Sequence, residues 1–182
     1  MSADAPQAHP HLGGGVKFCV SCGSPLVYRP WTEGDGTMQL CCSAASCNHV
    51  HFLDPKVAAG VVATIGREAV LLRRAHNPGK GLWTFPGGFV NRGEVVPEAA
   101  AREAKEEAGI EVAVDALLGV YSFEGNATVL IVYTGAVTEG VPRALAETTE
   151  VKLVAPDAID FDELAFDTTR AAMRDWRERV RG

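Results

Sequence analysis

Apolar and polar positions change their period several times along the chain, and each change predicts a different element. Residues 57–65 (VAAGVVATI) are almost wholly apolar, as in a strand that is covered on both faces of a sheet. After a polar turn, residues 69–74 return as a second strand, and residues 111–123 and 128–137 alternate or run apolar in the same way. A last short strand is expected at 151–154.

Two stretches have a helical period instead. Residues 97–108 contain only tolerable or good helix formers, with Pro97 suited to the first turn and Gly109 suited to a C-terminal cap. Residues 166–180 predict a second helix that packs on the core. Its apolar side chains fall on one side: Phe166, Met173, Trp176 and Val180. A further short helix is expected to begin within 158–161.

The order of these elements predicts an α/β domain. Strands interspersed with two helices, without an internal repeat, favour a mixed sheet between helices, although the pattern leaves the strand order open. Asp54-Pro55-Lys56 is interpreted as a hinge ahead of this domain. We therefore expect a disordered tail at 1–16, a small module at 17–55 and the α/β domain at 56–182.

Composition narrows the class of protein. An apolar content of 47% with 22% charged residues, in a chain of 182 residues, is typical of a globular protein with a proper core. The net charge of −6 argues against general nucleic-acid binding. The chain has no apolar run of membrane-spanning length and no N-terminal signal pattern, so we expect a cytoplasmic location and no membrane partner.

The five cysteines all fall between Cys19 and Cys47, which favours metal binding over disulfides. Two pairs separated by about twenty residues predict a zinc ribbon with tetrahedral sulfur ligation and a structural Zn²⁺. The preferred ligands are Cys19, Cys22, Cys42 and Cys47. The second pair departs from the usual CxxC spacing, so Cys41 is a rival third ligand, and His49 or His51 is a possible replacement for a sulfur.

The predicted helix at 97–108 carries an acidic cluster. Glu103, Glu106 and Glu107 occupy positions i, i+3 and i+4, so their carboxylates emerge on one face of the helix. Like charges so placed repel by about a few tenths of a kcal/mol. A hard divalent cation such as Mg²⁺ or Mn²⁺ would neutralise them, and the competing interpretation is a solvated acidic face.

The spacing around these glutamates favours the metal site. Gly88, Glu94, Arg102-Glu103, Glu106-Glu107, Gly109 and Ile110 are similar at every fixed position to the Nudix box, GX5EX7REUXEEXGU, with the small Ala104 where the pattern has a bulky apolar residue. The chain thus resembles a Nudix hydrolase, and its cysteine module resembles that of zinc-ribbon ADP-ribose, FAD and NADH pyrophosphatases. The resemblance implies an α/β/α sandwich with the box as a central strand–loop–helix.

The same resemblance implies roles for individual residues. Metal ligation is carried onto Glu103 and Glu107, with Glu106 beside them and the carbonyl of Gly87 or Gly88 as a further oxygen. Of two downstream glutamates, Glu147 and Glu150, the first is expected to complete the metal site. Arg102 is expected to pair with Glu94 or a neighbouring carboxylate and to fix the helix against the loop. The general base is Glu106, Glu103 or a loop glutamate.

Phosphate binding needs positive charge on this acidic chain. The candidates for steering phosphates are Arg73, Arg74, Lys80 and Arg92.

The activity that the resemblance implies is Mg-dependent hydrolysis of the pyrophosphate in a nucleoside diphosphate linked to another moiety. The resemblance also implies a homodimer. The SQPWPFPxS signature of NADH enzymes is absent at 119–126, while 161–166 and 81–88 look more like the ADP-ribose/FAD group. The alternatives are a nucleoside-triphosphate sanitiser and a non-catalytic nucleotide sensor, which the intact glutamates disfavour.

Overall fold

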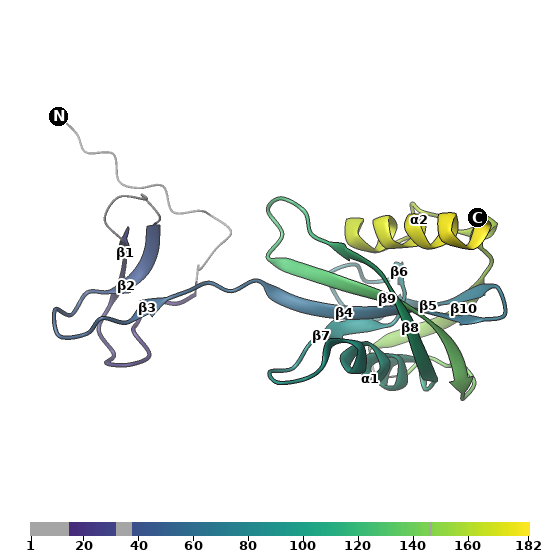
Figure 1. The fold of residues 1–182 in the computed structure, drawn as a ribbon, viewed down its shortest axis with the longest axis horizontal. Coiled ribbons are helices and arrows are strands. Elements are labelled where there is room, and N and C mark those ends of the chain that lie inside the picture. Colours follow the sequence, from purple (N-terminus) through teal and green to yellow (C-terminus); the bar gives the residue numbers. More distant parts are fainter. Residues whose placement is uncertain (1–14, 32–37, 146) are drawn as a thin grey trace. The chain divides into compact units, whose positions relative to one another are not determined.

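The computed structural model describes residues 15–31, 38–145 and 147–182, and the chain divides between Pro55 and Lys56 into two compact units (Figure 1). The tail predicted at 1–16 falls mostly on residues 1–14, which lie outside the described residues. No helix among the described residues is both long enough and apolar enough to cross a membrane.

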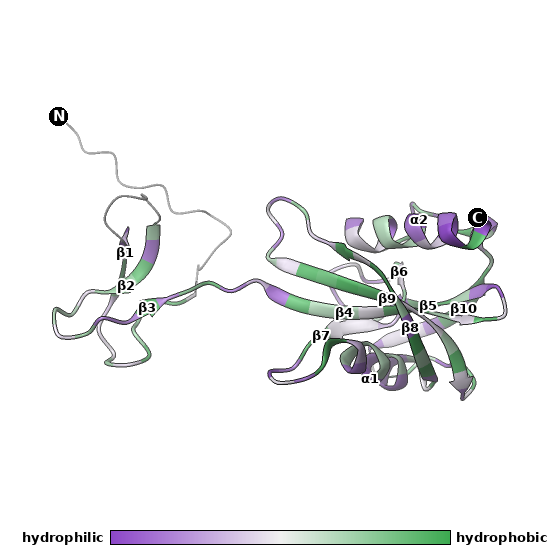
Figure 2. Ribbon diagram, viewed as in Figure 1, coloured by the Kyte–Doolittle hydropathy of each residue, from purple (hydrophilic) through white to green (hydrophobic). Residues whose placement is uncertain are grey.

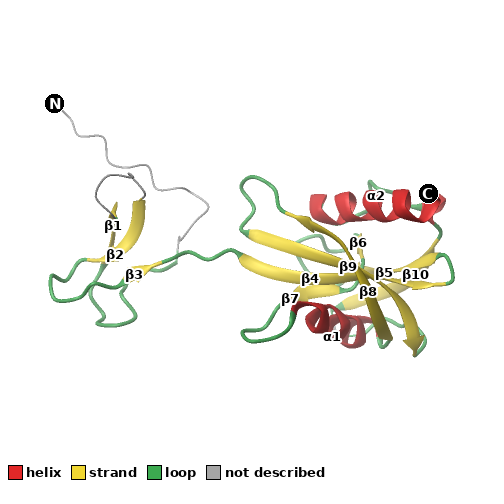
Figure 3. Ribbon diagram, viewed as in Figure 1, coloured by secondary structure: helices red, strands yellow, loops and turns green. Residues whose placement is uncertain are grey.

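The first unit is a three-stranded antiparallel sheet with the order β1-β2-β3 (Figure 3). Its strands are β1 (Leu26–Pro30), β2 (Met38–Cys42) and β3 (Val50–His51). Among the described residues of this unit, the buried apolar side chains are Leu40 and three cysteines, Cys19, Cys41 and Cys42. So small a core buries little surface, and modules of this size usually depend on a metal or disulfides.

The second unit contains a seven-stranded mixed sheet with the main order β10-β5-β4-β9-β8. Strands β6 and β7 pair with β5 and β4 respectively. Strands β4 and β9 run parallel, and the other paired strands run antiparallel. The strands are β4 (Lys56–Ile65), β5 (Glu68–Arg74), β6 (Trp83–Thr84), β7 (Gly87–Phe89), β8 (Glu111–Tyr121), β9 (Thr128–Glu139) and β10 (Thr148–Val154).

Two helices, α1 (Val96–Ala108) and α2 (Asp167–Arg181), cover opposite faces of this sheet (Figure 1). The colouring in Figure 2 shows apolar central strands between helices that carry polar residues. One core cluster joins the α2 residues Met173 and Trp176 to the sheet, and the other joins the alanines of α1 to it. Ala104 is fully buried, so its small side chain lets α1 pack closely against the sheet. The predicted α/β/α sandwich with a mixed sheet is confirmed.

Three details differ from the sequence-based expectations. Gly87 and Gly88, where the apolar pattern predicts no strand, form the short strand β7 because they pair with the middle of β4. The short helix is a 3₁₀ turn, η1 (Pro156–Ala158), and ends before most of the expected residues. Phe166 precedes α2 in an extended conformation and stacks on Arg74 outside the core, because it is the N-cap of the helix.

Candidate functional site

Two glycines bring β7, β4 and α1 close together. A Cβ on Gly87 would lie 2.8 Å from the Ala59 carbonyl oxygen and from Gly60 Cα, so only glycine fits against β4 here. A Cβ on Gly88 would lie 2.5 Å from the carboxyl carbon of Glu103. The absence of side chains at these positions lets the helix carboxylates reach the backbone of β7.

Glu107 is the most enclosed of the acidic residues, with 8% of its surface exposed. One carboxylate oxygen accepts a hydrogen bond from the Gly87 N–H at 3.0 Å. Burial raises the pKa of Glu107 to about 7, the nearby charges of Glu103 and Glu147 add to the rise, and the Gly87 N–H and Arg74 oppose it. A buried carboxylate of this kind gains most from a cation, and its oxygens are hard ligands of the type that Mg²⁺ and Mn²⁺ prefer.

Arg102 connects the helix to the loop before it. Its guanidinium donates two hydrogen bonds to Glu94, at 2.7 and 3.1 Å, and a third to the Phe89 carbonyl at 3.1 Å. Glu94 also accepts the Asn91 N–H at 2.8 Å. The hydrogen bonds from Arg102, and after them the bond from Asn91, lower the pKa of Glu94 to about 2. This carboxylate is therefore ionised and paired with Arg102.

The other two helix glutamates contact the same guanidinium. Arg102 Nη1 lies 2.8 Å from Glu103 and 3.0 Å from Glu106. Glu103 is mostly buried, which raises its pKa, whereas over half of the Glu106 side chain is exposed. Glu103 and Glu107 therefore face the strand side of the site, and Glu106 is the carboxylate open to water.

The downstream glutamates separate into two environments. Glu147 is exposed, its carbonyl accepts the Ala75 N–H at 2.8 Å, and its charge contributes to the raised pKa of Glu107. Glu150 instead forms an ion pair with Arg73 at 2.8 Å. Glu147 is therefore the one that lies near the helix carboxylates.

The four phosphate-steering candidates do not form one cluster of free cations. Arg73 also donates to the Gly81 carbonyl at 2.8 Å. Arg74 donates to the Pro78 carbonyl at 2.8 Å and stacks on Phe166. Both arginines thus brace the loop before β6. Lys80 and Arg92 are exposed on loops and remain the better candidates for reaching a ligand.

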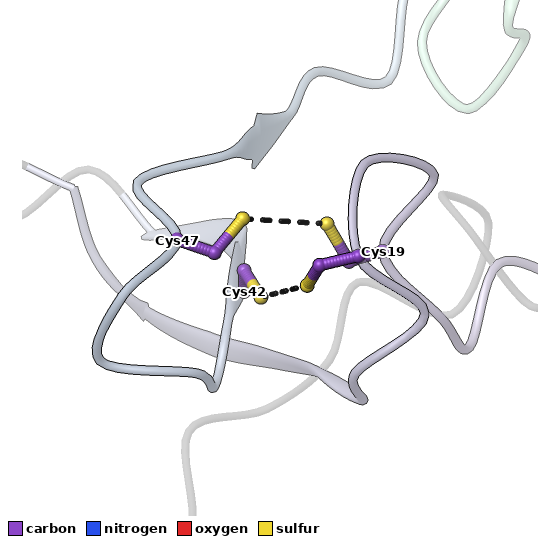
Figure 4. A group of neighbouring side chains, drawn as sticks. Cys19, Cys42 and Cys47 are labelled. Atoms are coloured by element: carbon purple, nitrogen blue, oxygen red, sulfur yellow. Dashed lines mark hydrogen bonds between the residues drawn. The ribbon is translucent and has the colours of Figure 1, made fainter.

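The cysteine module forms a compact group of sulfurs. The Sγ atoms of Cys19, Cys22, Cys42 and Cys47 all lie within 4.8 Å of one another. Figure 4 shows the labelled Cys19, Cys42 and Cys47 converging, and the marked separations are 3.9 Å from Cys19 to Cys47 and 3.4 Å from Cys22 to Cys42. A tetrahedron with zinc–sulfur bonds of about 2.3 Å has sulfurs roughly 3.8 Å apart, so the group fits a zinc ion.

The structure shows which of the rival cysteines and histidines lie with the other sulfurs. Cys41 and Cys42 are neighbours on β2, so their side chains point to opposite faces, and only Cys42 belongs to the sulfur group. His49 lies outside the group and contacts Ser21 through Nδ1 at 3.2 Å. Hydrogen bonds from Ser24 lower the pKa of Cys22 to about 6. At Cys42 a backbone hydrogen bond from Ala44 lowers the pKa, but burial and the neighbouring thiols outweigh it and raise the pKa to about 12, so of these two sulfurs only Cys22 favours the thiolate that a metal requires.

Sequence reasoning missed one residue at the edge of the acidic site. The hydroxyl of Thr148, the first residue of β10, lies 3.1 Å from the Glu107 carbonyl oxygen. The two residues are far apart along the chain, and Thr148 belongs to no motif, so no local pattern could have indicated this contact.

Known proteins resemble the chain in both sequence and fold. An "ADP-ribose pyrophosphatase" of Methanocaldococcus jannaschii is 46% identical over 71 residues, which is 39% of this chain and 42% of that protein. A "NAD-capped RNA hydrolase NudC" of Stutzerimonas stutzeri is 34% identical over 96 residues, covering 53% of this chain and 32% of the relative. The chain thus spans less than half the length of these two curated relatives.

A solved NUDIX hydrolase from Nitrosomonas europaea superimposes with a TM-score of 0.83 and 30% identity, over 92% of this chain and 94% of that one. An ADP-ribose pyrophosphatase from Streptococcus suis shares the fold, with a TM-score of 0.60 and 21% identity, over 70% of this chain and 91% of its own. The family described as NUDIX domain matches residues 54–178, which include β4, β7 and the whole of α1. The protein belongs to the NUDIX hydrolase family.

Proposed function

We propose that the protein is a Mg²⁺-dependent pyrophosphohydrolase that cleaves a nucleoside diphosphate linked to a second moiety, with ADP-ribose as the preferred class of substrate. The observation that carries this proposal is the buried Glu107 carboxylate, bonded to the Gly87 N–H beside Glu103 and Glu147. The 46% identity to a protein named ADP-ribose pyrophosphatase supports the choice of substrate.

The residues of the site would have different roles in hydrolysis. Glu103, Glu107, Glu147 and a carbonyl of Gly87 or Gly88 would hold the divalent cation, which neutralises the pyrophosphate and lowers the pKa of water. Arg102 keeps the helix and its loop in register through Glu94. Lys80 and Arg92, exposed on loops, attract the phosphates. Glu106, whose side chain is more than half exposed, would accept a proton as water attacks phosphorus.

The cysteine module has a separate proposed role. We propose that Cys19, Cys22, Cys42 and Cys47 hold a structural zinc ion, which is supported by the mutual distances of their sulfurs. A closed four-sulfur site leaves no position for substrate, so this metal would stabilise the small sheet and take no part in hydrolysis. A homodimer and a cytoplasmic location remain predictions.

A substrate panel tests the proposed activity. Purified protein with Mg²⁺ is incubated with ADP-ribose, FAD, NADH and nucleoside triphosphates, and the released nucleotide is measured. ADP-ribose should be hydrolysed fastest. A preference for nucleoside triphosphates would indicate a sanitising enzyme, and binding of ADP-ribose without turnover at several Mg²⁺ concentrations would indicate a sensor.

Glu107→Gln tests the metal site within the same panel. The substitution keeps the shape of the side chain but removes its charge, so the rate of hydrolysis should fall by more than about tenfold. Glu98→Gln is the matched control, because Glu98 is exposed in the first turn of the same helix. Equal rates for Glu107→Gln and Glu98→Gln would exclude Glu107 as a metal ligand.

A further inference from the structure

The loop that returns from β9 to β10 is attached to the C-terminal turn of α1. The carbonyls of a last helical turn have no partner within the helix and need donors from elsewhere. Here Ala108 O accepts the Arg143 N–H at 3.0 Å, and Glu107 O accepts the Leu145 N–H at 3.2 Å. The returning loop thus caps the helix that carries the acidic residues.

Thr148 closes this attachment with its side chain. Its hydroxyl oxygen accepts the Leu145 N–H at 3.0 Å, and its one proton is shared between the carbonyls of Leu145, at 2.8 Å, and Glu107, at 3.1 Å. The Thr148 N–H also donates to Leu145 O at 3.0 Å. A hydroxyl is the smallest side-chain group that donates and accepts at once, so an isosteric valine cannot replace these contacts.

The residue before Thr148 is Glu147, which is held from the other side as well. Its carbonyl accepts the N–H of Ala75, the residue after β5, at 2.8 Å. The register of β10 against β5 shifts between Thr148 and Glu150, so Thr148 lies opposite Arg74 and Glu150 lies opposite Arg73. Such a bulge re-aims neighbouring side chains, and here it directs Glu150 to Arg73 while Thr148 faces α1.

We propose that Thr148 is a positioning residue, whose hydroxyl ties the loop to the Glu107 carbonyl and thereby holds the Glu147 carboxylate at the divalent-cation site. This inference rests on the proposed function, because it assigns Glu147 to the metal. The Glu107 side chain and main chain then serve the same site: the carboxylate would bind the cation, and the carbonyl anchors the loop that carries a second ligand.

The adjacent threonine provides a matched control. The Thr149 hydroxyl makes one long contact, at 3.4 Å, to the Arg73 carbonyl, and it is exposed. Thr149→Val therefore makes the same chemical change one residue away, on the same strand, without touching α1. Thr148→Ser keeps the hydroxyl and loses only a methyl group.

The test is a double-mutant cycle on the full chain. Thr148→Val, Thr148→Ser and Thr149→Val are made with Glu147 intact and in a Glu147→Gln background. Mn²⁺ binding is titrated by electron paramagnetic resonance without substrate, and ADP-ribose hydrolysis is measured against Mg²⁺ concentration. Thr148→Val should weaken Mn²⁺ binding by about tenfold, as is common for groups that support metal ligands. Thr148→Ser and Thr149→Val should bind like the wild type.

In the Glu147→Gln background, Thr148→Val should weaken Mn²⁺ binding by less than about twofold, because the carboxylate that it positions is gone. Equal losses in both backgrounds, or a serine variant as weak as the valine variant, would overturn the proposal. The unfolding temperature of each variant is measured in parallel, and a loss of metal binding that follows the unfolding temperature alone counts against it. If the wild type hydrolyses nothing, the proposed function fails, while the Mn²⁺ titration still decides the role of Thr148.

Discussion

Two glutamates of the same motif have opposite electrostatic environments. Glu94 is paired with the Arg102 guanidinium and its pKa falls to about 2, whereas burial raises the pKa of Glu107 to about 7. The first is therefore a structural anion at neutral pH. The Glu107 carboxyl group is about half protonated near neutrality when no cation is bound. This state is expected of a carboxyl group in a metal site before the metal binds.

These pKa values predict how stability depends on pH in metal-free protein. Glu107 has a folded pKa above its ordinary value of 4.5, so its contribution to stability is present below that value and is lost as the pH rises through about 7. Glu107→Gln should make the decline in unfolding temperature between about pH 4.5 and 7 shallower, when measured with a chelator present. An unchanged slope in this variant would contradict the raised pKa.

Glu94 provides the opposite sign in the same experiment. Its folded pKa is depressed, so its contribution is present above about pH 4.5 and is lost as the pH falls through about 2. Glu94→Gln should therefore lower the unfolding temperature near neutral pH and reduce the further loss on acidification. The two variants should thus change the pH profile at opposite ends.

At the scale of elements, the site depends on how closely β7 approaches its neighbours. Gly87 lies against the backbone of β4, and Gly88 lies against the Glu103 carboxyl group of α1. The two positions look equivalent in the sequence. Gly87, however, faces the rigid backbone of β4, whereas Gly88 faces the flexible end of the Glu103 side chain. They are expected to respond differently to the same methyl group.

Gly88→Ala should displace the Glu103 carboxylate, which is the movable end of its side chain, and lower the Mg²⁺-dependent rate by about tenfold or more with little change in the unfolding temperature. Gly87→Ala should destabilise the fold by about 1–3 kcal/mol, because its Cβ meets backbone atoms that are fixed by pairing. Urea unfolding and hydrolysis rates, measured on both variants, check the contrast. A Gly88→Ala protein with normal activity would show that Glu103 is free to move without consequence.

At the scale of the whole molecule, the chain consists of two units with different sources of stability. The second unit has two apolar clusters, one on each face of its sheet, whereas the buried residues in the described part of the first unit are mainly cysteines. We therefore expect the small unit to depend on zinc and the larger unit to fold on its own core.

Adjacent cysteines test this dependence. Cys42→Ala should remove most of the bound zinc, because it deletes one of the four clustered sulfurs, whereas Cys41→Ala should keep it. Zinc per chain is measured by plasma mass spectrometry, and the thermal unfolding of the larger unit should be the same in both variants. Equal zinc in the two variants would mean that the sulfur group is not the binding site.

Features that depend on local geometry could be predicted from the sequence. The period of an α-helix places Glu103, Glu106 and Glu107 on one face, so this arrangement could be predicted from their spacing. The four cysteines preferred from the sequence lie together as a cluster of sulfurs, and their binding of zinc stays a prediction. The class of the fold followed from the period and order of the apolar segments.

Tertiary structure alone decided which distant groups meet. Cys42, and not Cys41, belongs to the sulfur group because the two side chains lie on opposite faces of β2. The different surroundings of Glu147 and Glu150 depend on the register of β10 against β5. The contact between Thr148 and the last turn of α1 joins segments that are remote in sequence. Pairing register and loop return are set by the packing of the whole domain, so no local pattern contains them.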